Sequence, residues 1–151
     1  MSDIRPVSYR AILEAPNAHS LMSEYETECA LPELAPISPQ CDLYHAMEES
    51  GNFQAFGVYE GEKLIGFVTV LIWVVPHYGK KIASTESIFL SEAHRNSGLG
   101  AKMLALVEGY AKSKGCAAVQ YTAPVGSRFA RLLAMNVARY RRTNLIYLRS
   151  L

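Results

Sequence analysis

The chain has 151 residues, which suits one ordinary domain over residues 1–151 with no room for a second hydrophobic core. Half of the residues are hydrophobic and 19% are charged, a balance that excludes a disordered chain. The formal net charge of +1 argues against a protein that mainly coats nucleic acid, because such domains are far more basic.

The cysteines and the apolar segments narrow the class of protein further. Cys29, Cys41 and Cys116 lack C-x-x-C spacing, so we expect neither a disulfide framework nor a zinc site of four thiolates. The histidines show no metal-binding spacing either, and we expect no metal. The chain start lacks the apolar core of a signal peptide, and the run 64–75 is too short for a membrane span. We therefore expect a cytoplasmic protein that does not bind membranes.

Charge is distributed unevenly along the chain. Residues 14–49 contain eight acidic residues and no Lys or Arg, whereas residues 125–151 contain six arginines and no acid. One interpretation is a pair of solvated faces that attract each other, and the other is a basic surface for an anionic ligand. Nucleic acid is an unlikely ligand because the net charge is close to zero.

The first third of the chain predicts short elements. Val7–Leu13 is interpreted as a strand, and Pro16 and Asn17 open a helix that continues to about Cys29. Three prolines make Leu31–Gln40 an irregular link. Asp42 is predicted to cap a short helix that ends at Ser50.

The middle of the chain predicts three strands. Phe53–Tyr59 and Lys63–Val75 flank the turn Glu60-Gly61-Glu62, which indicates a hairpin. The second of these strands is almost continuously apolar, as a central strand covered on both faces should be. After a turn at residues 76–80 the chain returns as the strand Ile82–Leu90.

The last third changes from strand to helix periodicity. Gly100–Lys114 has apolar residues at helical spacing, and Gly115 suits the position after its end. Cys116–Thr122 is predicted as a strand, Ser127–Met135 as a helix and Thr143–Leu148 as the final strand. The resulting order, β-α-α-β-β-β-α-β-α-β, predicts an α/β fold: a mixed sheet with helices on both faces.

The most informative motif is Arg95-Asn96-Ser97-Gly98-Leu99-Gly100, R-x-x-G-x-G, between a predicted strand and an amphipathic helix. Glycines let the backbone approach a ligand, and the amides of a helix N-terminus suit a pyrophosphate. No Gly-Lys-Ser/Thr follows, as a Walker loop requires, and Arg95 stands where a dinucleotide fingerprint has glycine. The alternative is a glycine-rich turn that only packs the helix on the sheet.

This motif and the order of elements from Val7 to Leu148 resemble the GNAT superfamily of acetyl-CoA-dependent N-acetyltransferases. The resemblance implies acetyl-CoA as cosubstrate and a primary amine as acceptor, on a small molecule or on a protein lysine or N-terminus. It implies direct attack in a ternary complex of both substrates with the enzyme. Dimers are common in the family, so a homodimer is a further expectation.

The resemblance also assigns the cofactor contacts. The backbone of Ile88 and Leu90 would pair with the pantetheine arm where the strands Ile82–Leu90 and Cys116–Thr122 splay apart. Ser127 lies near the position of a family asparagine. The backbone amides that would cradle the pyrophosphate belong to Arg95, Asn96, Ser97, Gly98, Leu99, Gly100 and Ala101.

For catalysis, strand alternation predicts Ser84, Glu86, Ile88 and Leu90 on one face. Family members often carry the general base at the positions of Ser84 or Glu86, which implies Glu86 as base and Ser84 beside the substrate. The N–H of Leu90 would polarise the thioester carbonyl. The alternative for Glu86 is a simple ion pair with Lys or Arg at the strand end.

One departure from the family concerns the general acid. With Tyr140 set against the aromatic residue that follows the last helix, Ala134 or Met135 stands where many members have the acidic tyrosine. Tyr140, Tyr121 or water then protonates the thiolate, or the thiolate leaves unaided; of the side chains, we assign Tyr140. The missing tyrosine also favours an alternative function, a catalytically weak CoA-binding sensor or interaction module.

The acceptor contacts are predicted from the loops. His77 and Tyr78 stand on the turn before the strand Ile82–Leu90, which in this family often borders the acceptor cleft. The alternative is a turn stabilised by its own polar side chains. Acidic residues beside the proline-rich segment, Glu26 and Glu28 among them, would favour a cationic amine.

Overall fold

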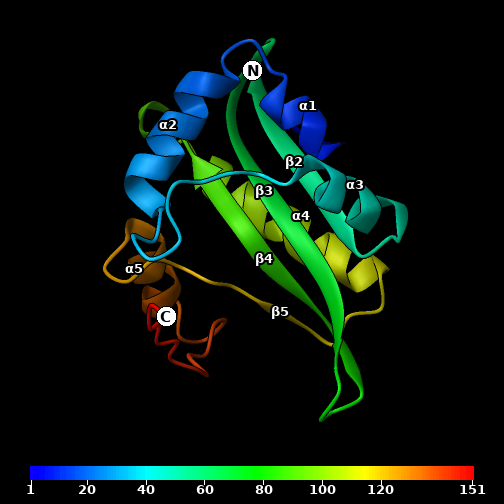
Figure 1. The fold of residues 1–151 in the computed structure, drawn as a ribbon. Coiled ribbons are helices and arrows are strands. Elements are labelled where there is room, and N and C mark those ends of the chain that lie inside the picture. Colours follow the sequence, from blue (N-terminus) through cyan, green and yellow to red (C-terminus); the bar gives the residue numbers. More distant parts are fainter.

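A computed structural model describes all residues 1–151 and contains a five-stranded sheet with helices on both faces (Figure 1). The strands are β1 (Ser2–Val7), β2 (Phe53–Glu60), β3 (Lys63–Val75), β4 (Lys80–Leu90) and β5 (Ala118–Gln120). The helices are α1 (Tyr9–Leu13), α2 (Ala18–Cys29), α3 (Cys41–Glu49), α4 (Leu99–Ser113) and α5 (Arg128–Met135), with a 3₁₀ turn, η1, at Glu92–His94. None of the helices is long and apolar enough to cross a membrane.

The strands lie in the sheet in their chain order. The first four are antiparallel neighbours, and β5 joins β4 in parallel. A parallel pair requires a crossover connection, and α4 provides it. The predicted mixed α/β sheet with helices on both faces is therefore confirmed.

Strand β3 separates two hydrophobic cores, as its continuous apolar sequence predicts. On one face Val68 packs in a cluster with Val107 of α4, and both side chains are completely buried. On the other face Phe67 packs in a cluster with Leu21 of α2, again almost completely buried. Figure 1 shows α1, α2 and α3 over one face of the sheet and α4 over the other. The sheet is thus a packed platform that fixes the position of β4.

The predicted N-terminal strand is wrong. Within Val7–Leu13 only Val7 belongs to a strand, and α1 follows. Ser8 caps this helix, because its hydroxyl accepts a hydrogen bond from the Ala11 amide at 3.1 Å. So short an apolar segment fits either period, and the cap decides in favour of a helix. The cap of α3 is also corrected: the helix begins after Gln40, and Asp42 lies inside its first turn.

The predicted final strand is wrong as well. Thr143–Leu148 lies outside every strand, and Leu145, Ile146 and Tyr147 are 70–85% exposed. Their β-prone side chains stabilise a strand only where they pack on a sheet. The edge strand β5 has only three residues and pairs with β4 alone.

A β-bulge interrupts the pairing of β4 with β3. Thr69 lies opposite Ser87 and Val70 lies opposite Thr85, so Glu86 is an extra residue on β4. Such an insertion reverses the alternation of side chains on the bulged strand beyond that point.

The bulge corrects the predicted face of β4. Ser84 and Glu86 lie on the face covered by α1, α2 and α3. Ile88 and Leu90 instead pack against the core beneath α4. The prediction that all four residues share a face is therefore wrong for Ile88 and Leu90.

Candidate active site

The turn between β4 and α4 presents its backbone to open space. Asn96 has a φ of 69° and Gly98 a φ of 81°, so both adopt the left-handed conformation. A Cβ placed on Gly98 or on Gly100 would meet no heavy atom within 4 Å. The glycines therefore leave room for a ligand directly against the main chain.

Most amides of this turn have no partner in the protein. Arg95 N–H donates to the Glu92 carbonyl at 3.2 Å, and Leu99 N–H to the Ser97 hydroxyl at 3.4 Å. The other predicted cofactor amides, those of Asn96, Ser97, Gly98, Gly100 and Ala101, have no hydrogen-bond acceptor. Free amides at the positive end of a helix dipole form a site that suits an anion.

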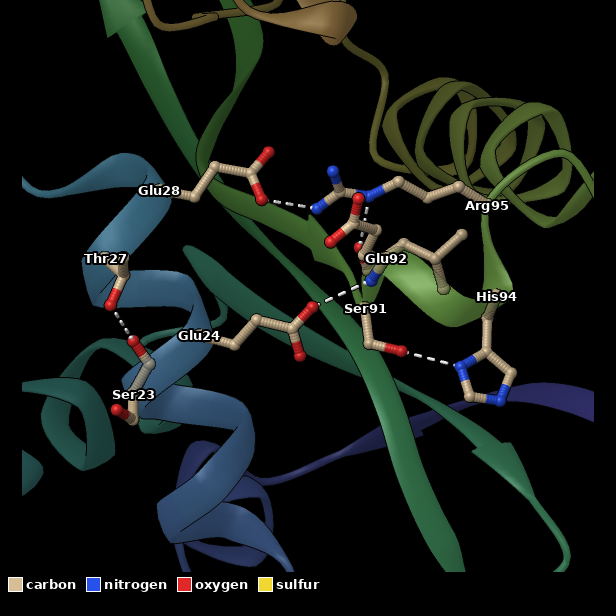
Figure 2. Close-up of polar contacts among 9 residues, drawn as sticks. Ser23, Glu24, Thr27, Glu28, Ser91, Glu92, His94 and Arg95 are labelled. Carbon is tan, nitrogen blue, oxygen red and sulfur yellow. Dashed lines mark hydrogen bonds and ion pairs between the residues drawn. The ribbon is translucent and has the colours of Figure 1, made fainter.

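The side chain of Arg95 points toward α2 (Figure 2). Its Nε donates to the Leu90 carbonyl at 2.8 Å, and its Nη2 donates to Glu28 Oε2 of α2 at 2.5 Å. One helical turn earlier, Glu24 Oε1 accepts the Glu92 amide at 2.8 Å. Helix α2 therefore holds the turn at two points, and only the backbone of the turn is free for a ligand.

The two contacts of Arg95 predict unequal effects on stability. Arg95→Ala leaves the Leu90 carbonyl without its donor and should lower the free energy of unfolding by about 1–3 kcal/mol. Glu28→Gln weakens only a partly exposed ion pair and should cost at most about 1 kcal/mol. Urea unfolding of both variants measures the difference. Equal losses would show that the bond to Leu90 does not stabilise the fold.

The carboxylate of Glu86 is exposed to solvent and held from two sides. The Tyr44 hydroxyl of α3 donates to Oε1 at 3.0 Å, and the Thr69 hydroxyl of β3 donates to Oε2 at 2.7 Å. No Lys, Arg or His forms an ion pair with Glu86. The alternative reading of Glu86 as a member of a strand-end ion pair therefore finds no support.

Next to Glu86, the outer edge of β4 is unpaired. Ser91 N–H donates to the Ile65 carbonyl of β3 at 2.9 Å. Because bonds alternate along an antiparallel ladder, the amides of Ile88 and Leu90 point away from β3. On that side β5 pairs with β4 only at Ile82–Ser84. The two amides thus face the gap where the strands separate.

The start of α5 lies beside the turn. Ser127 caps this helix by accepting the Ala130 amide at 3.0 Å, and the Arg128 guanidinium donates to the side-chain oxygen of Asn96. The turn therefore has an arginine next to its free amides, a residue that the sequence analysis did not single out. No ion pair joins the acidic residues 14–49 to the arginine-rich residues 125–151.

Tyr140 lies on the opposite side of the sheet from the Glu86 carboxylate. Its hydroxyl donates to Glu108 of α4 at 3.1 Å, and Tyr121 donates to the same oxygen at 3.2 Å. Partial burial disfavours the charge on Glu108, but hydrogen bonds from Arg139, Tyr140 and Tyr121 outweigh it and lower the pKa of Glu108. The structure does not bring Tyr140 to Glu86, and its role as an acid stays a prediction.

The predicted acceptor residues are divided between two places. Ser84 lies two residues from Glu86 on the same face of β4. His77 and Tyr78 lie at the far tip of the β3–β4 hairpin (Figure 1), with their rings 4.9 Å apart. At about 3.4 Å per residue, the six steps along β4 from Lys80 to Glu86 span roughly 20 Å. The structure does not bring the hairpin tip to Glu86.

The two acidic residues predicted to attract the acceptor have partners in the protein. Glu26 Oε1 accepts the Ile37 amide of the proline-rich segment at 2.9 Å, and Glu28 pairs with Arg95. One cavity of about 490 Å³ lies between α2 and residues 91–94, and no predicted site residue lines it. No cluster of three or more His, Cys, Asp or Glu side chains could hold a metal ion.

Comparison with known proteins agrees with this fold. The family model described as Acetyltransferase (GNAT) family matches residues 16–131. No curated protein sequence matches the chain. Among solved structures, ribosomal-protein-alanine N-acetyltransferase from Brucella melitensis superposes with a TM-score of 0.71 at 17% identity, covering 99% of both chains. An aminoglycoside acetyltransferase from an uncultured soil metagenomic sample superposes with a TM-score of 0.72 at 14% identity, covering 98% of this chain and 94% of its own chain. Glucosamine-6-phosphate N-acetyltransferase from Arabidopsis thaliana superposes with a TM-score of 0.69 at 13% identity, covering 99% of this chain and 98% of its own chain.

Proposed function

This chain belongs to the acetyltransferase (GNAT) family, which uses acetyl-CoA, and we propose that it moves the acetyl group of acetyl-CoA to a primary amine. The observation that carries the proposal is the turn Arg95–Ala101, whose free amides face open space beside the unpaired edge of β4. Glu86 lies on the same strand as this edge and supplies a carboxylate for proton transfer.

The turn fits the pyrophosphate of CoA in charge and shape. The free amides of Asn96, Ser97, Gly98, Gly100 and Ala101 supply donors, and the two glycines have no side chain in front of them. The N-cap Ser127 stands at the start of α5, whose Arg128 is bonded to Asn96 and brings a positive charge to the turn. The bound cosubstrate supplies an activated thioester.

The proposed reaction is one direct transfer. The amine nitrogen attacks the thioester carbonyl carbon, the C–N bond forms, and the C–S bond breaks. Glu86 accepts the proton that the amine must lose, directly or through a water. The Leu90 amide points into the gap between β4 and β5 and donates to the carbonyl oxygen as charge develops on it.

The leaving group needs little help from the protein. A thiol has a pKa of about 8.5, so CoA can leave as a thiolate near neutral pH and take its proton from water. This agrees with the position of the Tyr140 hydroxyl, which is bonded to Glu108 on the other side of the sheet. Water is therefore sufficient as the proton donor, and a side-chain acid at Tyr140 stays the alternative.

We propose a positively charged amine as the acceptor. Residues 11–62 contain no Lys or Arg, and this segment includes α2 and α3, which cover the Glu86 face of the sheet. A negative potential over the entrance would concentrate cations there. The similar structures bear names that refer to ribosomal-protein alanine, aminoglycosides and glucosamine 6-phosphate, so the fold does not select among amines.

Two measurements test the proposed function. Acetyl-CoA should raise the unfolding temperature, and thiol should be released in the presence of at least one amine from a panel. The panel contains spermidine, an aminoglycoside, a lysine peptide, a peptide with N-terminal alanine and glucosamine 6-phosphate. No stabilisation by acetyl-CoA would overturn cofactor binding. Stabilisation without amine-dependent thiol release would favour the CoA-binding sensor.

A further inference from the structure

The side chains around Glu86 form a hydrogen-bond network whose members have no role in the proposed reaction. Thr69 is the single polar residue in the apolar sequence of β3 between Leu64 and Val75, and it is completely buried. A buried hydroxyl needs partners, and the bulge at Glu86 supplies them. Tyr44 reaches the same carboxylate from α3.

The direction of the bonds at Thr69 follows from counting hydrogens. Ser87 N–H donates to Thr69 Oγ1 at 2.9 Å, and the hydroxyls of Ser87 and Thr69 are 2.7 Å apart. A hydroxyl has one hydrogen and accepts two bonds. The hydrogen of Thr69 goes to Glu86 Oε2, so the Ser87 hydroxyl donates to Thr69. The bulge thus orients one donor at the carboxylate.

Tyr44 is held by a neighbouring aromatic ring. Its ring stacks on the ring of Tyr9 with centroids 3.7 Å apart and an interplanar angle of 17°. Tyr9 is buried in α1, and its amide donates to Glu48 Oε1 of α3 at 2.6 Å. The two helices are therefore tied together, and the Tyr44 hydroxyl is fixed over Glu86 Oε1.

The ionisable groups that face Glu86 are tyrosines, one from each covering helix: Tyr9, Tyr25 and Tyr44. Burial, followed by the charge of Glu86, raises the pKa of Tyr9 to about 12 and raises that of Tyr25 and Tyr44 as well. All three hydroxyls stay protonated near neutral pH. Tyr44 is thus a permanent donor to the carboxylate.

We infer that Tyr44 and Thr69 are positioning residues that hold the Glu86 carboxylate aimed at the acceptor amine. The inference rests on the proposed function, in which Glu86 is the base. Each carboxylate oxygen receives one hydroxyl bond and keeps one lone pair free, so the carboxylate is fixed in orientation and stays able to accept a proton from the amine.

The inference predicts how the mobility of the Glu86 side chain and the rate change when a donor is removed. In Tyr44→Phe and in Thr69→Val, the Glu86 side chain should become more mobile, since one carboxylate oxygen loses its donor. The same variants should lower kcat by up to about 10²-fold and leave the KM for acetyl-CoA unchanged, because the base is misplaced while the cofactor site is intact. Thr69→Ser keeps the hydroxyl and should restore the wild-type mobility and kcat.

The mobility is followed by NMR relaxation of labelled glutamate side chains in the free protein, with Glu86→Gln to assign the signal. The kinetic measurements use acetyl-CoA and the best amine of the panel. Thr27→Val is the matched control, because the Thr27 hydroxyl bonds only the Ser23 carbonyl of its own helix (Figure 2). It should change neither readout.

The two readouts separate two failures. If the mobility of Glu86 rises as expected but no amine is turned over, the positioning is correct and the proposed function is wrong. If turnover is found and the mobility stays at the wild-type value in both Tyr44→Phe and Thr69→Val, the inference is overturned. If Thr69→Val does not fold, the result for Tyr44→Phe, which retains the ring stack on Tyr9, distinguishes these outcomes.

Discussion

Replacing Glu86 by Gln should lower kcat by about 10²–10⁴-fold, the usual contribution of a general base. The amide keeps the size of the side chain. Its oxygen can accept from Thr69 and its NH2 can donate to the Tyr44 hydroxyl, so the fold and the affinity for acetyl-CoA should not change. Steady-state kinetics at saturating acetyl-CoA measure the loss, and calorimetry measures cofactor binding.

The pH dependence of this loss identifies its cause. An amine that is already neutral in solution needs no base, so the defect of Glu86→Gln should shrink as the pH approaches the pKa of the acceptor. Glu62→Gln, in the exposed β2–β3 turn, makes the same chemical change far from the site and should be as active as the wild type. A Glu86→Gln variant with full kcat at neutral pH would exclude Glu86 as the base.

Glu86 also marks the limit of what the sequence could predict. The resemblance to the GNAT family, together with the position of Glu86 on a predicted strand, was sufficient to select it. Its partners were not predictable, because the bulge sets which residue of β3 lies opposite. Periodicity assumes regular pairing, and one inserted residue places Ile88 and Leu90 on the other face. The polar Thr69 within β3 was the available signal.

The long elements were predicted well for a different reason. The bounds of β3 agree with the prediction, and α4 agrees within one residue at each end, because both carry many apolar residues that satisfy one period. The segments Val7–Leu13 and Thr143–Leu148 contain too few apolar residues to distinguish the helical period from the strand period. The first is decided by the cap at Ser8, and the second lacks a partner strand. Tertiary context, which a single sequence does not contain, decides such segments.

The motif at residues 95–100 lies between a strand and a helix, as predicted, but the contacts of its side chains were not predicted. Arg95 is the residue that makes the motif distinctive, and its guanidinium stabilises the turn through Leu90 and Glu28. The acidic residues of α2 therefore act, in part, on the turn for which cofactor binding is proposed. Glu24 and Glu28 lie one helical turn apart, so both carboxylates are on the same face of α2. On that face Glu24 accepts the Glu92 amide and Glu28 accepts from Arg95.

The largest loss of cofactor binding is expected for Gly98→Val. Gly98 has a φ of 81°, a conformation that costs other L-residues about 1–2 kcal/mol and β-branched residues more. The new side chain would also fill the open space in front of the turn. Displacing the pyrophosphate from two amides, at about 1.5–3 kcal/mol for each bond to a charged group, weakens binding by about 10²–10⁴-fold. Calorimetry with CoA measures the change.

Gly61→Val separates the loss of binding from the loss of stability. Gly61 has a φ of 62° in the turn between β2 and β3, and a Cβ there also meets no atom within 4 Å. The two variants therefore carry a similar backbone strain and should lose similar free energy of unfolding. Only Gly98→Val has its new side chain in front of the free amides, so only this variant should lose affinity for CoA. Wild-type affinity in Gly98→Val would mean that the pyrophosphate binds elsewhere, and the assignment of the turn would be wrong.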